Sequence, residues 1–260
     1  MLLLSLAIMT VIALGGKPEK PETIVAPKLA TLSWNQFPNA QFPRGREGTR
    51  SQSRLRAPVS TAKNVLKYRP NYKITWVHPT NYGERYTKDI NGIAVYNQSI
   101  IVLHETANSA SSAINFFQTP HLDNNRQASY HTLIELDGTI VYLVPPDKRA
   151  FGAANSAFDG PNGPETVKTN PDLPPSVNNF AYHSAFETPP DGWNKAKTHN
   201  GYTDAQYHSL AWLIAQSNIP NERITTHRAV DRSGQRIDPR SFDVEKFLLL
   251  LHFYRLATGL

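Results

Sequence analysis

The sequence predicts an α/β domain that follows a disordered N-terminal extension. Short runs rich in β-branched and aromatic residues, typical of strands, recur between residues 74 and 144 and again at 223–226. Three further segments carry apolar residues at helical spacing: Ser109–Gln118, Thr203–Ser217 and Val244–Ala257. Residues 17–70 contain repeated prolines and an excess of positive charge, which disfavours a folded core there. A chain of 260 residues is long enough for one domain and such an extension.

The first sixteen residues are almost wholly apolar. This length fits a signal peptide better than a membrane span, which needs roughly 20 residues. We expect either a cleaved signal or an anchor that associates with the membrane, although the stretch lacks the Lys or Arg usual at the start of a signal peptide. The chain has no Cys, which excludes a lipoprotein anchor and suits an oxidising compartment. We therefore expect a periplasmic or extracellular protein of the cell envelope.

Residues 17–70 are expected to form a basic, proline-rich linker. Twelve Lys and Arg stand against three Glu between Lys17 and Lys73, which gives this stretch a local charge of +9. The formal charge of the whole chain is +6, so the remainder carries about −3. This balance argues against nucleic acid as a partner of the folded domain. Weak adhesion of the linker to anionic cell-wall polymers or lipid headgroups is the alternative to a simple tether.

The folded domain is expected to span residues 71–258. Its first strand candidates are Ile74–Val77, Ile93–Tyr96 and Ser99–Leu103, and the helix Ser109–Gln118 follows them. The third strand ends by presenting His104. A histidine in this position is either a packed core imidazole or a metal ligand, and its own sequence context does not decide between them.

Two apolar strands within Ser129–Val144 flank Asp137 and Gly138. This dipeptide predicts a hairpin with a type I′ turn, in which both residues have positive φ. Because side chains alternate along a strand, Tyr130 and His131 are expected on opposite faces, and His131 is expected to be structural.

A second group of candidate ligands lies between Arg223 and Asp243. His227 directly follows a short predicted strand at 223–226, and a turn-rich loop leads to Asp238, just before Pro239. An imidazole and a carboxylate can form two corners of a zinc site, which needs a third ligand and one open position for water. Because the chain has no Cys, any zinc must be bound by His and carboxylate.

The helices that flank this stretch are expected to act as scaffold. Thr203 and Gln206 form a capping-box sequence at the start of the segment 203–217. The segment 244–257 has an equally clear apolar stripe, and its run FLLLLHFY is too short to span a bilayer.

Taken together, these segments resemble the zinc-dependent N-acetylmuramoyl-L-alanine amidases, a superfamily that includes the peptidoglycan recognition proteins. The resemblance rests on IVLHET with His104, on the hairpin YHTLIELDGTIVYLV, and on His227 with Asp238. It covers roughly residues 99–254. It implies a central mixed β-sheet flanked by helices, with one Zn²⁺ at the edge of the sheet. His104, His227 and Asp238 match the three metal ligands of the family.

The resemblance also implies catalytic roles. The segment NNFAYHSAFETP matches a strand that closes beside the zinc, so Glu187 is expected to be the general base; a surface glutamate is the alternative. Tyr130 matches a tyrosine that some members place near the metal-bound water. Arg236 stands where many relatives have lysine, and it could stabilise the oxyanion of a tetrahedral intermediate but not donate a proton. Three further arginines of the same loop could instead bind the carboxylates of a peptide stem: Arg228, Arg232 and Arg240.

The implied activity is hydrolysis of the amide bond between N-acetylmuramic acid and L-alanine, in peptidoglycan or in muropeptides. We expect a monomer. A non-catalytic peptidoglycan-binding module is the alternative, and the intact ligand set argues against it. A zinc endopeptidase is a third possibility, but the chain lacks an H-E-x-x-H motif. The loop 155–178 holds five prolines and departs from the family pattern, so it could form a distinct substrate wall.

Overall fold

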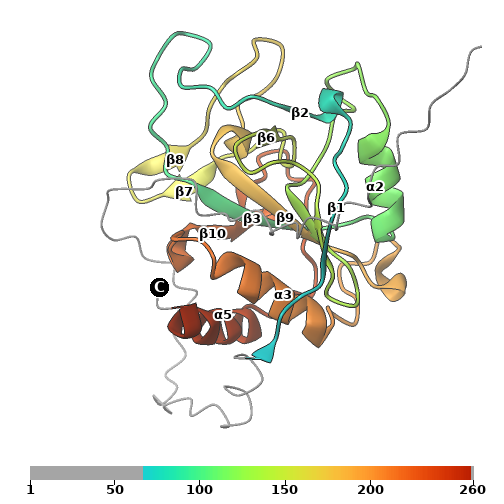
Figure 1. The fold of residues 1–260 in the computed structure, drawn as a ribbon. Helices are drawn as coiled ribbons and strands as arrows, with labels where there is room; N and C mark the ends of the chain where they lie inside the picture. The colour runs from blue at the N-terminus through green and yellow to red at the C-terminus, as the bar shows by residue number, and fades with distance from the viewer. Residues whose placement is uncertain (1–66, 259–260) are drawn as a thin grey trace, which may run out of the picture.

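The computed structural model describes residues 67–258, so the predicted leader and most of the predicted linker lie outside the described residues. The centre of the domain is a six-stranded mixed sheet in the order β1-β5-β4-β9-β3-β10 (Figure 1). Its strands are β1 (Tyr72–Ile74), β3 (Ile100–Glu105), β4 (Thr132–Ile134), β5 (Ile140–Tyr142), β9 (Ala181–Phe186) and β10 (Ile224–Thr226). The predicted α/β class with a central mixed sheet is confirmed.

Strands β3 and β9 form the buried middle of this sheet. Every residue of both strands is buried, and the two pair in parallel with His104 opposite Ala185. β10 pairs in parallel with the other side of β3, with Thr226 opposite Leu103. The carboxyl ends of three neighbouring strands therefore meet at one edge of the sheet. Parallel strands buried on both faces favour unbroken apolar runs, which accounts for the sequence at 100–103.

Two helices, α3 (Asp204–Ile214) and α5 (Val244–Thr258), cover one face of the sheet (Figure 1). Leu103 of β3 packs with Leu210 of α3 and Leu251 of α5 in one buried cluster. Both predicted scaffold helices are confirmed by these elements. Their apolar stripes are the surfaces buried against the sheet, as their spacing predicts.

The start of α3 is the predicted capping box. The hydroxyl of Thr203 accepts a hydrogen bond from the backbone N–H of Gln206, and the Gln206 side chain accepts one from the backbone of Thr203. Two of the N–H groups at the helix start are therefore satisfied within the motif itself.

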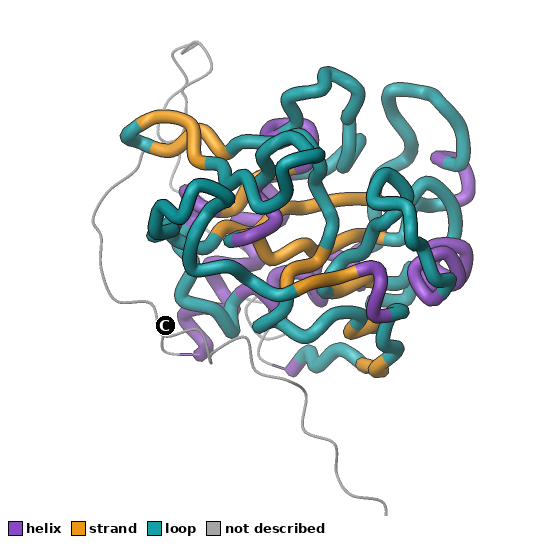
Figure 2. The backbone as a smooth tube through the Cα atoms, turned by 90° about the horizontal axis from the view of Figure 1, so that it is seen from above, coloured by secondary structure: helices purple, strands orange, loops and turns teal. Residues whose placement is uncertain are grey.

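Helix α2 (Ala110–Gln118) and a set of loops cover the opposite face, which Figure 2 shows from above. Phe117 of α2 packs with Leu133 of the central hairpin, and Val102 of β3 packs with Val230. Because alternate residues of a strand share a face, His104 lies on this loop-covered face with Val102. The remaining short elements are η2 (Pro79–Asn81), β2 (Tyr82–Gly83), β6 (Arg149–Ala150), β7 (Phe158–Gly160), β8 (Gly163–Glu165), η3 (Val177–Asn179), η4 (Pro190–Gly192), η5 (Asn221–Arg223) and α4 (His227–Val230).

Two of the early strand predictions differ from the structure. The segment Ile93–Tyr96 is a loop, with one isolated bridge from Ala94 to Lys88, and the Tyr96 side chain is 88% exposed. The prediction of a strand there is wrong, because the segment is largely exposed and its pairing with residues 87–89 is limited to this bridge and two backbone hydrogen bonds. The predicted strand Ile74–Val77 begins earlier, as β1, and its remaining residues continue to bond β5 and its extension through Thr75 and Val77.

The central hairpin is confirmed, but its turn is not of type I′. β4 and β5 pair antiparallel with Ile134 opposite Ile140, which leaves five residues in the turn. Gly138 has a φ of +87°, whereas Asp137 does not have positive φ. The N–H of Gly138 donates to the carbonyl of Glu135 at 2.8 Å. A side chain at Gly138 would also approach the Ala205 carbonyl of α3 to 2.8 Å, so the position needs glycine for space as well as for conformation.

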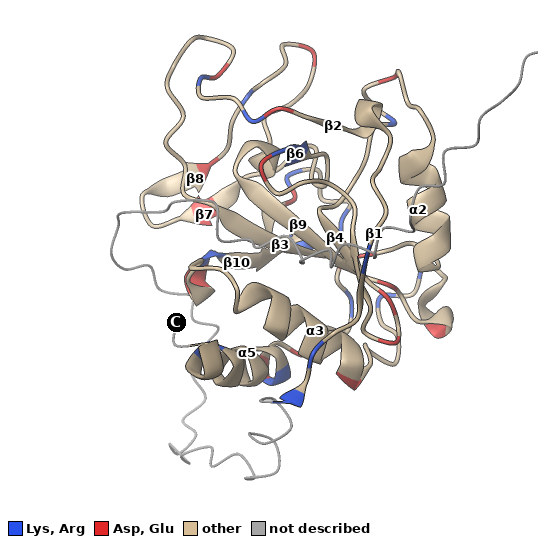
Figure 3. Cartoon of the chain, viewed as in Figure 1, with Lys and Arg blue, Asp and Glu red and all other residues tan. Residues whose placement is uncertain are grey.

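Figure 3 shows Lys and Arg interspersed with Asp and Glu along the loops and helices of the described domain. This distribution agrees with the low charge expected for the domain outside the linker. Within residues 67–258, no helix has both the length and the apolar character needed to cross a membrane.

Candidate metal centre

The parallel strands bring the two predicted histidine ligands together. His104 is the fifth residue of β3, and His227 directly follows β10 as the first residue of the short helix α4. Thr226 caps α4 by accepting a hydrogen bond from the backbone N–H of Ala229. Carboxyl ends of adjacent parallel strands are where side chains converge in α/β sheets. His104 and His227 are 123 residues apart in the sequence, and the pairing of β3 with β10 brings them together.

Asp238 completes the group from the loop that follows α4. Its Oδ2 atom lies 3.0 Å from Nδ1 of His227 and 3.4 Å from Nδ1 of His104. The two imidazole rings are 4.6 Å apart, and one ligand atom from each of the three residues lies within 4.8 Å of the others. The structure therefore brings together all three residues predicted as metal ligands.

These three residues fit a zinc ion. Nδ1 of His104 is fully buried and has no hydrogen-bond partner within the described part of the chain. A buried imidazole nitrogen without a partner is costly unless a ligand uses its lone pair. Two imidazoles and one carboxylate that leave a fourth position open are a typical ligand set of catalytic zinc.

The electrostatics of the group keep its ligands in the forms that bind metal. Burial lowers the pKa of His104 to about 4, in spite of the nearby Asp238 carboxylate, so its imidazole is neutral at pH 7. Burial by itself would raise the pKa of Asp238, but the neighbouring imidazoles of His104 and His227 outweigh it and hold that pKa well below its usual range. A neutral imidazole and an ionised carboxylate are the states that coordinate zinc.

The metal-ligand group lies in a cleft of about 910 Å³. The loop 155–178 contributes one part of its wall through Thr169, Asn170 and Leu173, where the sequence predicted a substrate wall. The cationic residues that line the cleft are Arg126, Arg149, Arg236 and Arg240. Arg149 stacks over the rings of Tyr86 and Phe151, at 4.9 Å and 5.3 Å from their centroids.

Tyr130 stands beside the metal ligands, as predicted. Its ring centroid is 4.7 Å from that of His104, and Phe117 of α2 supports it from the other side. Burial raises the pKa of Tyr130 above its ordinary value, so the phenol is neutral at pH 7 and can donate a hydrogen bond. His131 is buried and does not line the cleft. It stacks on Tyr182 and accepts a hydrogen bond from the backbone N–H of His183, contacts that agree with a structural role.

Glu187 is not part of this group, and the expectation that it closes beside the metal is corrected. One carboxylate oxygen accepts from the backbone N–H of Ala110 at 2.8 Å, and the other accepts from Leu136 at 3.0 Å. Ala110 is the first residue of α2, so Glu187 satisfies a free N–H at a helix N-terminus, where a negative charge is also favourable. Glu187 does not line the cleft. Glu187 therefore has a structural role, as an acceptor for two backbone N–H groups.

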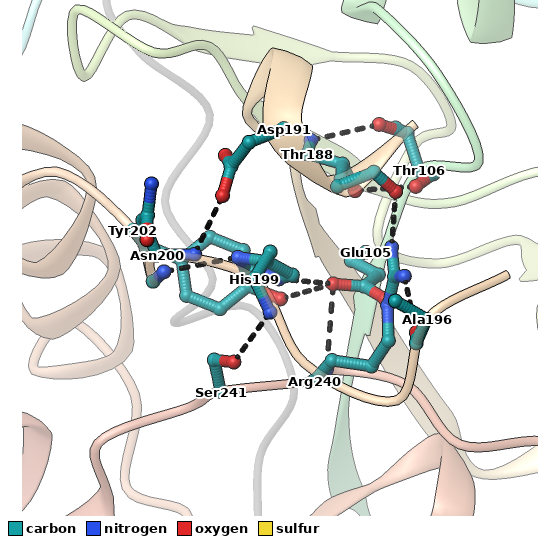
Figure 4. Close-up of polar contacts among 12 residues, drawn as sticks. Glu105, Thr106, Thr188, Asp191, Ala196, His199, Asn200, Tyr202, Arg240 and Ser241 are labelled. Carbon is teal, nitrogen blue, oxygen red and sulfur yellow. Dashed lines mark hydrogen bonds and ion pairs between the residues drawn. The ribbon is translucent and has the colours of Figure 1, made fainter. Parts of the chain in front are cut away.

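A buried ion pair that the sequence did not reveal lies behind the metal ligands. The carboxylate of Glu105, next to His104, accepts hydrogen bonds from the side chain and backbone of Arg240, from Tyr202 and from His199 (Figure 4). Glu105 and Arg240 are 7% and 6% exposed. Arg240 follows Asp238 by two residues, so this pair connects the strand of one ligand to the loop of another.

Arg240 is therefore unavailable to substrate, which corrects one of the predicted stem-binding arginines. Its remaining guanidinium N–H groups donate to the carbonyls of Gly192, Asn194 and Ala196. Arg232 pairs with Asp159, and neither Arg228 nor Arg232 lines the cleft. Arg236 is the member of that loop whose exposed side chain lines the cleft with no role in this buried network.

Residues 95–241 match the family model described as N-acetylmuramoyl-L-alanine amidase. This segment is more than half of the chain. The chain belongs to the N-acetylmuramoyl-L-alanine amidase family. Membership of this family supports a peptidoglycan amidase, and the His104, His227 and Asp238 group supplies a possible metal site for it. A comparison with curated protein sequences found no match.

Several solved structures are similar to this amidase-family chain. A selenomethionine derivative of AmpD is 24% identical with a TM-score of 0.47, and the match covers 70% of this chain and 94% of AmpD. AmpDH3 from Pseudomonas aeruginosa is 16% identical with a TM-score of 0.44, covering 71% of this chain and 64% of AmpDH3. The amidase LysC from Clostridium intestinale URNW is 22% identical with a TM-score of 0.41, covering 69% of this chain and 97% of LysC.

The contacts of Glu187 predict a loss of stability in Glu187→Gln. The carboxylate now accepts a hydrogen bond from each of two backbone N–H groups. In glutamine, the NH₂ group would face one of these N–H donors, and that hydrogen bond would be lost. We expect a loss of about 1.5–3 kcal/mol, the usual value of hydrogen bonds to a charged group, measured by thermal or denaturant unfolding. Turnover of the correctly folded enzyme should stay near the wild-type value.

Glu135→Gln is the matched control for this substitution. Glu135 pairs with Lys73 at the surface, and exposed ion pairs contribute about 0–1 kcal/mol. A fall of turnover by about 10²–10⁴-fold in Glu187→Gln at unchanged stability would contradict the structural role and restore Glu187 as the general base.

Proposed function

We propose that this protein is a zinc-dependent amidase that cleaves the bond between N-acetylmuramic acid and the L-alanine of the peptide stem. The observation that carries the proposal is the His104, His227 and Asp238 group in a large cleft of a chain that belongs to the amidase family. Its substrate is peptidoglycan or a muropeptide derived from it.

When bound by these three residues, zinc would polarise the scissile carbonyl and lower the pKa of water to about 7. The side chain of Arg236 supplies a permanent positive charge to the cleft, so it stabilises the negative charge that develops on the carbonyl oxygen. The neutral phenol of Tyr130 donates a hydrogen bond at the same centre. Both groups act as electrostatic stabilisers, and Arg236 keeps its proton throughout.

The cleft offers no spare carboxylate to act as a general base. Among the described residues that line it, Glu105 and Asp238 are the carboxylates. Glu105 is occupied by four hydrogen bonds from its neighbours, and Asp238 is a metal ligand in this proposal. The reaction therefore depends on the increased acidity of water and on donors around the carbonyl. The proton that the attacking water loses is the one that the departing amine gains, and with Glu187 remote no spare carboxylate among the described lining residues carries it between them.

We also propose that the enzyme acts outside the cytoplasm, in the cell envelope. The apolar leader, the basic linker and the lack of Cys support this location. Cell fractionation with N-terminal sequencing tests it, and recovery of the full-length protein in the cytoplasm with its leader intact would contradict it.

The products of digestion test the proposed bond. Full-length enzyme incubated with peptidoglycan should release stem peptides with a free L-alanine amino group, identified by mass spectrometry. Asp238→Asn should release none, because it removes a charged zinc ligand. Cleavage inside the stem peptide would identify an endopeptidase, and binding without products would identify a recognition module.

Arg236 variants test the stabilisation of the oxyanion. We expect Arg236→Gln to lower kcat by about 10²–10³-fold, the usual effect of losing one such donor, with zinc content unchanged. Arg236→Lys should retain much of the activity because it keeps the charge. Arg232→Gln is the matched control, since Arg232 pairs with Asp159 outside the cleft. Wild-type kcat in Arg236→Gln would remove this residue from the mechanism.

A further inference from the structure

A second buried histidine contacts the metal ligand His104 on the side away from the metal-ligand group. His183 lies on β9, and its Nδ1 atom is 2.9 Å from Nε2 of His104. In the register of β3 and β9, His183 is opposite Val102 and Ala185 is opposite His104, so both histidines are on the same face of the sheet. His183 has no exposed surface.

The two ring nitrogens of His104 face different partners. Nδ1 of His104 points toward Asp238 and has no hydrogen-bond partner in the described chain, while Nε2 meets His183. An imidazole that uses the Nδ1 lone pair for a metal carries its proton on Nε2. That N–H needs an acceptor in a buried site, and Nδ1 of His183 is in position to accept it. His183 then carries its own proton on Nε2, which is buried and has no partner within the described residues.

The backbone around His183 holds the acceptor in place. The N–H of His183 donates to Nδ1 of His131 at 2.9 Å, and the carbonyl of His183 accepts from the N–H of His131 at 2.9 Å. Nε2 of His131 in turn contacts the carbonyl of Lys148 at 3.1 Å. The backbone of His183 is thus held by His131 through both its N–H and its carbonyl.

Gly152 provides the space that the His183 ring occupies. A Cβ atom built at Gly152 would lie 2.5 Å from both Cγ and Nδ1 of His183. Gly152 does not have positive φ, so its backbone conformation alone does not require glycine. The reason for glycine here is therefore the close approach of this one imidazole.

We propose that His183 is a positioning residue for the metal centre, which accepts the hydrogen bond of His104 Nε2–H at Nδ1, and that Gly152 is the residue that makes room for it. This inference rests on the proposed zinc function. Partners of this kind fix the tautomer and ring orientation of a metal ligand, and their loss weakens metal binding by about 10–100-fold. His183 is not itself in the group of metal-ligating atoms.

A matched pair of substitutions separates hydrogen bonding from packing. His183→Asn keeps an acceptor, since Oδ1 of asparagine takes the place of Nδ1, whereas His183→Leu keeps the bulk and removes the acceptor. The zinc Kd of full-length protein is measured by competition with a chelator. We expect His183→Leu to raise the Kd by about 10–100-fold and His183→Asn to stay close to wild type. Equal Kd values for Leu and wild type would overturn the proposal.

Gly152→Ala provides an independent test that does not depend on the folding of His183→Leu. The added methyl group should displace the His183 ring and raise the zinc Kd. In a His183→Ala background the ring is gone, so Gly152→Ala should have no further effect on the Kd. Such non-additivity is the signature of two residues in contact. Effects of Gly152→Ala that are equal in both backgrounds would contradict the assigned role of Gly152.

The wild-type measurement separates this inference from the proposed function. If wild-type protein binds no zinc, the proposed function itself fails, and this inference fails with it. If wild type binds zinc and neither His183→Leu nor Gly152→Ala changes the Kd, the positioning role alone is wrong. Unfolding of the metal-free variants shows whether any change in Kd merely follows a loss of fold.

Discussion

The parallel pairing of β3 with both β9 and β10 is the constraint on which the rest of the site depends. It brings the carboxyl ends of three strands to one edge, where His104 and His227 face each other across a single strand pairing. Helices α3 and α5 fill the other face of the sheet, so the edge and the loop-covered face are the places left for a cleft (Figures 1 and 2). The strand order thereby determines where the metal-ligand group lies.

The third ligand depends on a loop, and a buried ion pair holds that loop. Arg240 reaches from the loop of Asp238 to Glu105, the neighbour of His104, and to three backbone carbonyls. The Coulombic gain of buried pairs is largely offset by the cost of removing two charges from water, so their usual contribution to net stability is small. The Glu105–Arg240 pair is better understood as a device that fixes geometry. His183 would do the same for the ring of His104, by one hydrogen bond.

The sequence predicted the elements whose signals are local. The capping box at Thr203 and the apolar run before His104 each depend on neighbours a few residues away, and the structure agrees with both. Glu187 and Arg240 could not be placed in this way. A strand pattern shows which face a residue takes, but not that the Glu187 carboxylate meets the N-terminus of α2, 77 residues away. The strand prediction for Ile93–Tyr96 was wrong for a related reason. Strand propensity is a local property and does not show whether a neighbouring segment pairs over enough residues to form a strand.

X-ray absorption at the zinc edge of the full-length, zinc-loaded protein is the most direct test of the metal centre. We expect one zinc per chain, with two imidazole nitrogens at about 2.0–2.1 Å and one carboxylate oxygen at about 2.0–2.2 Å. In a His104→Ala, His227→Ala variant, the imidazole scattering should disappear. Zinc coordinated without imidazole in the wild-type protein, or an unchanged imidazole signal in the double variant, would contradict the assignment.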